Sequence, residues 1–399
     1  MKKIVYTFLM ITIIFTSCSN DDDVVLIDVT DKESLTQRLD QILEKSNFPG
    51  FTIGIVKDGK IALQESFGYQ NLEDQIPYNN KTLQSIGSIS KIFIGVATIK
   101  AIALGYFTLE TPINDILPRP IINPKNPSAV IRVKHLVNHT SGLIDENNVY
   151  LSSYYLLSNQ NLSTSGTQIM ESYGITSREP KTLQQFIEAY FYKKGDYYSD
   201  DNFYGVTPGT QEIYTNVGAS LMAYIIQESS GMKYPDFIKV NILDPLKMTS
   251  TSFYYDQPLD QYATLYFNKN TPLPLYNLES FPDGALKTSN EDIMKFFLDM
   301  IRGQQGLSTT LFNKEYYELL FTATSENFTV FWDILDNEKG TFGHTGGDPG
   351  LSTQLLFSEA SNAGFYVISN YDASIDEHEA HYKEIASQIN KSINMYLSN

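Results

Sequence analysis

The chain has 399 residues, of which 42% are hydrophobic and 13% are aromatic. Such a composition supports a sizeable core, and the length exceeds that of one small domain, so we expect two lobes around a shared cleft. The formal net charge of −17 gives a surface that repels phosphate backbones. Nucleic acid is therefore not an expected partner.

The N-terminus has the layout of a secretory signal peptide. Met1, Lys2 and Lys3 form a charged start, and an apolar run extends from Ile4 to Phe15. This run is too short to span a bilayer, which takes about 20 residues. We expect residues 1–17 to direct export.

Cys18 is the only cysteine, and its place after the apolar run resembles the lipobox of bacterial lipoproteins, in which the thiol is lipidated. The alternative is a conventional signal peptide followed by an incidental cysteine. Residues 18–30 then form an acidic tether, in which Asp21–Asp23 resembles an outer-surface export tag or is only a solvated spacer. We expect a protein without disulfides that is lipid-anchored to the bacterial cell envelope, at the outer membrane.

The first part of the mature chain predicts a helix, a hairpin and a buried helix. Apolar spacing predicts a helix from Thr30. Strands are expected over 51–56 and 60–69, joined by the turn Asp58-Gly59. Residues 88–104 are apolar on nearly every side, which indicates a helix buried all round.

The middle of the chain, residues 117–283, predicts a mainly helical insertion, with helices over 182–192, 217–228 and 234–242. Within it, the tyrosine-rich segment 150–204 is a candidate lid that selects the substrate. After it we expect a helix over 289–302, capped by Ser289, and a closing helix over 378–397. Strands are expected over 328–335, 340–344, 352–357 and 364–370.

A Ser-x-x-Lys tetrad places a hydroxyl and an amine one helical turn apart on the same side of a helix. Ser88 and Lys91 form one such tetrad at the start of the buried helix, where unpaired helix N–H groups can stabilise an oxyanion and a desolvated lysine can act as a base. Ser230 and Lys233 form a second tetrad, but Gly231 there indicates only the end of a helix. We therefore identify Ser88 as the candidate nucleophile.

Four segments in order resemble the penicillin-recognising serine hydrolases related to class C β-lactamases, DD-peptidases and family VIII-type esterases. The resemblance covers about residues 51–370. It implies an α/β (α+β type) transpeptidase-like fold, an antiparallel sheet flanked by helices with an inserted helical lobe. The lobes would comprise 31–116 with 284–399, and 117–283. The matching segments are TLQSIGSISK (82–91), LVNHTSGL (136–143), PGTQEIYTNVG (208–218) and GHTGGDPG (343–350).

The resemblance also assigns roles to the Tyr-x-Asn segment. Tyr214 would shuttle a proton between Ser88 and the leaving group, and Asn216 would hydrogen-bond the acyl side of the substrate. Because a tyrosine pKa near 10 is too high for an efficient base, we expect the Lys91 ammonium to lower the pKa of Tyr214 or to share its proton. The same pattern at Tyr69, Tyr78 and Tyr266 is interpreted as structural.

The third motif departs from the common Lys-Thr-Gly, since here it is His344-Thr345-Gly346. A histidine is mostly neutral at pH 7 and offers one donor, so substrates without a carboxylate become more plausible. Gly347 matches the position whose N–H joins that of Ser88 in the oxyanion hole. No metal or cofactor is expected, because the pairs His135/His139 and His378/His381 lack a convergent carboxylate motif, and His378/His381 is expected to be solvated.

These observations predict an exported serine hydrolase that acts on a small-molecule or peptide ester or amide through an acyl-enzyme on Ser88. One alternative is a penicillin-binding DD-peptidase or a β-lactamase proper. A second is a non-catalytic surface lipoprotein that uses the same fold for binding. The intact Ser88, Lys91, Tyr214 and Asn216 argue against the second.

Overall fold

The computed structural model describes residues 26–373 and 376–399. The predicted signal peptide, Cys18 and Asp21–Asp23 lie outside the described residues. Within the described ranges, no helix is both long and apolar enough to cross a bilayer.

The centre of the molecule is a seven-stranded sheet in which every neighbouring pair is antiparallel. Both ends of the chain contribute, because Ile53 of β1 pairs with Val367 of β14. The expected α/β fold with an antiparallel sheet is confirmed. In spatial order the strands are β11 (Asp333–Asp336), β12 (Thr341–Asp348), β13 (Leu351–Ser358), β14 (Ala363–Ser369), β1 (Gly50–Lys57), β2 (Lys60–Asn71) and β3 (Ile76–Pro77).

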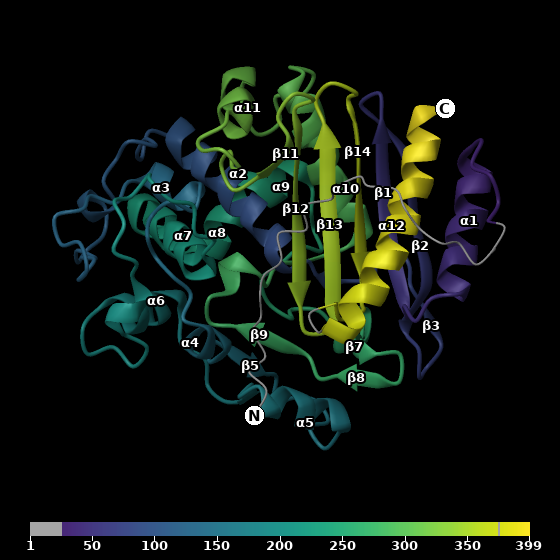
Figure 1. Cartoon of the computed structure of the whole chain (residues 1–399), viewed down its shortest axis with the longest axis horizontal. Coiled ribbons are helices and arrows are strands. Elements are labelled where there is room, and N and C mark those ends of the chain that lie inside the picture. The colour runs from purple at the N-terminus through teal and green to yellow at the C-terminus, as the bar shows by residue number, and fades with distance from the viewer. Residues whose placement is uncertain (1–25, 374–375) are drawn as a thin grey trace.

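Helices cover both faces of this sheet. The terminal helices α1 (Lys32–Glu44) and α12 (Asp376–Ser398) pack on one face, and α12 lies in front of the sheet in Figure 1. Strand β14 alternates between the two faces, as a strand buried on both sides must: Phe365 and Val367 join the core under the terminal helices, whereas Tyr366 and Ile368 join the larger core behind.

The larger core surrounds α2 (Ser90–Ala103), whose side chains are buried on nearly every side, as predicted. Helix α10 (Asn290–Gln304) packs beside it, with the rings of Phe93 and Phe296 stacked at 4.0 Å. The hydroxyl of Ser289 caps α10 by accepting a hydrogen bond from the Asp292 N–H at 3.2 Å, which confirms the predicted cap.

The segment between these helices is less uniformly helical than predicted. Its helices are α3 (Val133–Val137), α4 (Asn147–Leu151), α5 (Ser165–Ser172), α6 (Leu183–Phe191), α7 (Asn216–Ser230), α8 (Tyr234–Ile238) and α9 (Asp244–Leu246). It also contains the strands β5 (Tyr154–Leu156), β6 (Thr176–Ser177), β7 (Leu265–Asn268), β8 (Thr271–Leu273) and β9 (Tyr276–Leu278). The lobe boundaries at 117 and 283 stay predictions.

The remaining regular elements are short. Strands β4 (Gln84–Ser85) and β10 (Lys287–Thr288) pair with each other, and α11 (Lys314–Phe321) packs on α2 and α10. Single turns of 3-10 helix are η1 (Gly87–Ile89), η2 (Ile113–Asp115), η3 (Asp200–Asn202), η5 (Leu259–Gln261) and η6 (Phe281–Asp283), and η4 (Lys239–Leu243) is a π-helical turn.

Two local predictions are wrong. The strand expected over 328–335 is present only as β11, because Phe331 adopts a φ of +61° and the preceding residues turn into the core. The pair His378/His381 is not solvated: both rings pack against Tyr371, and His381 Nε2 accepts a hydrogen bond from the Asn47 N–H at 3.1 Å.

Candidate active site

Ser88 lies in the 3-10 turn η1, which directly precedes α2, and α2 begins at Ser90. The predicted helix start at Ser88 is therefore a 3-10 turn, which Gly87 enters with a φ of +55°. This turn packs tightly on β12, because a Cβ added to Gly87 would lie 3.2 Å from the Gly347 nitrogen. Ser88 is only 5% exposed, so its hydroxyl is positioned by a rigid and largely dry frame.

Lys91 projects from the first turn of α2 back towards Ser88. Its Nζ donates to Ser88 Oγ at 3.0 Å and to the main-chain oxygen of Asp283 at 2.8 Å. Lys91 is fully buried, and this burial lowers its pKa, although nearby carboxylates oppose the shift. The second tetrad forms no such pair, since Ser230 ends α7 and Gly231 follows with a φ of 70°.

Tyr214 lies against the same pair. Its ring is 5.2 Å from Lys91 Nζ, and a hydrogen bond with Ser88 favours its ionised form. Burial outweighs that bond and raises the pKa of Tyr214 well above 10. Desolvation of the phenolate outweighs any lowering of this pKa by Lys91, so Tyr214 is a neutral phenol. The sharing of its proton with Lys91 stays a prediction.

The turn at His139 holds the Tyr214 segment on both sides. His139 O accepts from the Ile213 N–H at 2.7 Å, and His139 Nδ1 accepts from the Thr215 N–H at 3.2 Å. The ring centroids of His139 and Tyr214 lie 4.5 Å apart. Burial lowers the pKa of His139 well below 6.5, so this ring is a neutral acceptor, as its contact with the Thr215 N–H requires.

Asp145 completes this support, and the sequence analysis missed it. Its carboxylate accepts four hydrogen bonds at the start of α7: from Thr215 Oγ1 at 2.8 Å, from the Asn216 N–H at 2.7 Å, from Asn216 Nδ2 at 2.8 Å and from the Val217 N–H at 3.0 Å. Asn216 is fully buried. Its amide nitrogen is therefore committed to Asp145, and its Oδ1 is the atom left for another contact.

His344 lies on β12 and is 5% exposed. Its Nδ1 is 2.5 Å from the carbonyl oxygen of Thr345, and a carbonyl only accepts, so Nδ1 carries the proton. Burial lowers the pKa of His344 to about 3, which keeps the ring neutral and leaves Nε2 as an acceptor. The single N–H group that His344 was expected to offer to a substrate donates to Thr345 O instead.

The two glycines that follow bring β12 against the nucleophile. A Cβ on Gly346 would meet Ile86 O at 2.5 Å and Ser88 N at 3.0 Å, so only glycine fits there. A Cβ on Gly347 would meet no heavy atom within 4 Å. Beside Ser88, the strand therefore has open space at Gly347.

Several buried acids surround the pair. Burial raises the pKa of Asp283 to about 6 and those of Asp333 and Asp348 to about 7, and Lys91 partly offsets each shift. These acids and Asp145 in turn act on Lys91. Ser88 therefore lies beside a single lysine, Lys91, which several acidic side chains surround.

The start of the tyrosine-rich segment forms part of this site. Tyr150 and Tyr154 are buried, and their hydroxyls donate to Asp283 at 2.9 Å and to Asp348 at 2.5 Å. A phenol can be buried in this way when its hydroxyl finds a partner. This end of the segment therefore supports the acids behind Lys91, and a role of the segment as a lid that selects the substrate stays a prediction.

The profile of the Beta-lactamase family matches residues 35–389, most of the chain. The chain belongs to the Beta-lactamase family. Protein flp of Staphylococcus aureus (strain MRSA252) is 24% identical over 378 residues, which cover 89% of this chain and 69% of that protein. Penicillin-binding protein 4* of Bacillus subtilis (strain 168) is 26% identical over 345 residues, covering 78% of this chain and 66% of that protein. Against the flp protein of strain N315, the covered share of the relative is 63%, so the chain spans about two thirds of these relatives.

Solved structures share the fold of this Beta-lactamase family member. The octameric penicillin-binding protein homologue from Pyrococcus abyssi superposes with a TM-score of 0.68 at 24% identity, over 89% of this chain and 76% of that one. EstCE1, a hydrolase with promiscuous acyltransferase activity, gives 0.68 at 15% identity, over 91% and 99%. These superpositions show that the chain shares its fold with both proteins.

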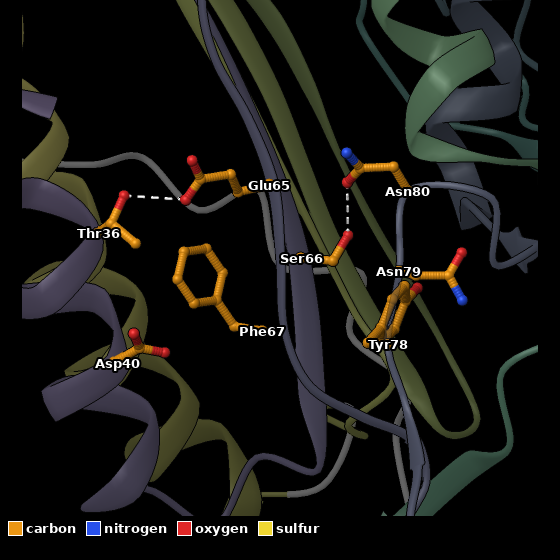
Figure 2. Close-up of a pocket in the computed structure, with 8 residues that line it drawn as sticks. All are labelled: Thr36, Asp40, Glu65, Ser66, Phe67, Tyr78, Asn79 and Asn80. Atoms are coloured by element: carbon orange, nitrogen blue, oxygen red, sulfur yellow. Dashed lines mark hydrogen bonds between the residues drawn. The ribbon is translucent and has the colours of Figure 1, made fainter. Parts of the chain in front are cut away.

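One cavity of this Beta-lactamase family chain lies away from Ser88. Figure 2 shows it between α1, which contributes Thr36 and Asp40, and β2, which contributes Glu65 and Ser66. It holds about 400 Å³, and a hydrogen bond from Thr36 Oγ1 to Glu65 at 2.9 Å joins two of the residues that line it. It contains neither of the Ser-x-x-Lys tetrads, so we place the chemistry at Ser88.

Proposed function

We propose that this chain is a serine hydrolase that cleaves an ester or amide through an acyl-enzyme on Ser88. The observation that carries the proposal is the 3.0 Å contact between Ser88 Oγ and the Nζ of Lys91, both buried. A serine hydroxyl is a weak nucleophile unless a base takes its proton, and a desolvated lysine is such a base.

Acylation begins with Lys91 in its neutral form. The amine keeps two N–H bonds, one of which can still donate to the Asp283 carbonyl at 2.8 Å, and its lone pair accepts the proton of Ser88. The Ser88 oxygen then forms a bond to the substrate carbonyl carbon. The N–H groups of Ser88 and Gly347, on packed neighbouring segments, are assigned to the oxyanion, where a single donor contributes about 10² to 10³ in rate.

The leaving group needs a proton when it is an amine or an alkoxide. Tyr214 is the donor we assign, because it is a neutral phenol that interacts with Ser88 and lies over Lys91. The bond between the carbonyl carbon and the leaving group breaks as Tyr214 gives up its proton, and Lys91, protonated after the attack, returns a proton to the resulting phenolate. Water then attacks the acyl-enzyme by the reverse sequence of proton transfers, which releases the acid and restores Ser88.

We propose substrates without a carboxylate next to the scissile bond. A carboxylate would need a cationic or donating partner at the third motif, but His344 is neutral and its proton is used by Thr345. Above their raised pKa values of about 6 and about 7, the nearby acids Asp283 and Asp348 would repel it further. The similarity to EstCE1, described as a hydrolase with acyltransferase activity, supports an ester.

A penicillin-binding activity is the second candidate, favoured by the similarity to penicillin-binding proteins of Bacillus and Pyrococcus. The two candidates separate on a panel of nitrophenyl esters, a chromogenic cephalosporin and D-alanyl peptides, assayed beside labelled penicillin. Rapid ester turnover with slow or absent acylation by penicillin supports the esterase. Stable acylation of Ser88 by penicillin supports the second candidate instead.

We further propose that the protein is exported and anchored to the envelope by a lipid on Cys18. The support is the order of a charged start, an apolar run and a cysteine in residues 1–18. Expression of the full chain and of Cys18→Ala in a bacterium, followed by membrane fractionation and labelled-palmitate incorporation, tests this. Anchoring predicts label only in the parent, and equal label or equal membrane association in both would refute it.

A further inference from the structure

We infer that Asp283 is a positioning residue of this site, whose buried carboxylate is the counter-charge that holds a proton on Lys91 and so sets the pH at which Ser88 becomes reactive. The inference rests on the proposed hydrolase function. It concerns a residue outside the serine, lysine and tyrosine motifs.

The geometry couples the two residues directly. Lys91 Nζ donates to the main-chain oxygen of Asp283 at 2.8 Å, and both side chains are fully buried. The Asp283 carboxylate accepts from Tyr150 at 2.9 Å and from Ser220 at 2.8 Å. Both donors are neutral hydroxyls, so they hold the carboxylate in place without a counter-charge of their own, and above its raised pKa of about 6 its charge acts on Lys91.

Other charged groups also face Lys91. Asp145, Asp348 and Asp333 raise its pKa too, but Asp283 has the largest effect of the four carboxylates. The acceptors of Asp145 are used by four hydrogen bonds at α7, and Asp348 is bonded to Tyr154. The remaining titratable neighbours are neutral: His139, His344 and Tyr214.

The direction of the effect follows from the charges. An ionised Asp283 stabilises the ammonium form of Lys91, which cannot accept the Ser88 proton. Without that charge, fewer carboxylates oppose the effect of burial on Lys91, and the free amine persists to lower pH. The acid limb of the acylation rate should therefore move to lower pH when the charge is removed.

The experiment measures kcat/KM for a nitrophenyl ester, and the rate of fluorophosphonate labelling, from pH 4.5 to 9 in the parent and in Asp283→Asn. We expect the acid limb of the variant to lie about one pH unit lower, the usual size of the effect of a close charge. Superimposable limbs would overturn the inference.

Asp299 provides a matched control. It is also a buried acid held by two hydroxyls, Ser308 and Tyr317 at 2.5 and 2.6 Å, but it is not among the carboxylates that act on Lys91. Asp299→Asn should leave the acid limb in place. A limb that moves equally in both variants would mean a general structural effect and would also overturn the inference.

Tyr150→Phe covers the case in which Asp283→Asn does not fold. The Tyr150 hydroxyl favours the ionised form of Asp283, so its loss should move the limb in the same direction by a smaller amount, and an unmoved limb contradicts the inference.

Failure of this inference is distinct from failure of the proposed hydrolase function. A parent protein that neither turns over esters nor reacts at Ser88 sinks both proposals, whereas an active parent with unmoved limbs sinks only this one.

Discussion

The carboxylate of Asp145 binds Asn216 twice, accepting its main-chain N–H at 2.7 Å and its side-chain amide at 2.8 Å. Two further bonds, from Thr215 and Val217, fix the first turn of α7. One acid from the loop after α3 therefore sets the position of the segment that begins at Tyr214. The geometry around Ser88 depends on this contact between distant parts of the chain.

Replacing Asp145 by alanine should reduce both stability and activity. It removes a helix cap and leaves buried donors unpaired, which costs about 1 to 3 kcal/mol of unfolding free energy. Because Tyr214 and Asn216 lose their anchor, ester hydrolysis per folded molecule should fall at least about tenfold. Denaturant unfolding and steady-state kinetics measure the two effects.

Ser289→Ala is the control for Asp145→Ala, because Ser289 caps α10 at 3.2 Å in the same way. It should cost about 1 kcal/mol and leave the activity of folded molecules unchanged. If Asp145→Ala loses stability but keeps full activity, the positioning role of Asp145 is wrong.

Tyr214→Phe should harm some substrates much more than others. Nitrophenolate leaves without help, whereas an amine or alkoxide needs a proton from an acid, and such an acid contributes about 10² to 10⁴ in rate. We expect a loss of at least about 100-fold in kcat/KM for anilides or alkyl esters, against less than about tenfold for nitrophenyl esters. An equal loss for both classes would remove Tyr214 from the role of proton donor.

His344→Lys should shift the substrate preference towards carboxylates. The substitution places an ammonium where the parent has a neutral ring, and a charge-assisted hydrogen bond contributes about 1.5 to 3 kcal/mol. The ratio of kcat/KM for a chromogenic cephalosporin to that for nitrophenyl acetate should rise about tenfold or more. An unchanged ratio would show that the third motif does not select against the carboxylate.

Asp348→Asn should stabilise the protein at alkaline pH. Burial raises the folded pKa of Asp348 to about 7, above the unfolded value of about 3.9. The folded state therefore binds the proton more tightly, and the contribution of this group to stability is present at low pH and lost as the pH rises through 7. Asparagine keeps an acceptor for Tyr154 without the charge.

The stability gain of Asp348→Asn over the parent should therefore grow between about pH 4 and pH 7, by on the order of 4 kcal/mol, and then level off. Denaturant unfolding at pH 4.5, 6 and 8.5 measures it. A difference that stays constant across this range would mean that Asp348 does not titrate in the folded protein near pH 7.

The residues that a fixed spacing connects could be predicted from the sequence. Ser88 and Lys91 are one helical turn apart, so local spacing predicts their contact, whereas the resemblance of the Tyr-x-Asn segment to the family motif placed Tyr214 beside them. Asp145 and Asp283 could not be found in this way. Each is a single acid in a loop, and only folding brings it to α7 or to Lys91.

Tertiary packing also overrode two local patterns. The aromatic and β-branched residues after Asn327 favour a strand, but Phe331 turns with a φ of +61° and Trp332 is fully buried. The many tyrosines of 150–204 suggested a loose polar segment. Tyr150 and Tyr154 are instead core residues, because buried acids accept hydrogen bonds from their hydroxyls.

Fluorophosphonate labelling with mass-spectrometric mapping tests the central claim most directly. The parent protein should be labelled at Ser88 and should hydrolyse nitrophenyl esters, and Ser88→Ala should lose both the label and the turnover. Label on another residue, equal reaction of Ser88→Ala, or no reaction of the folded parent with any probe would contradict a serine hydrolase that works through Ser88 and Lys91.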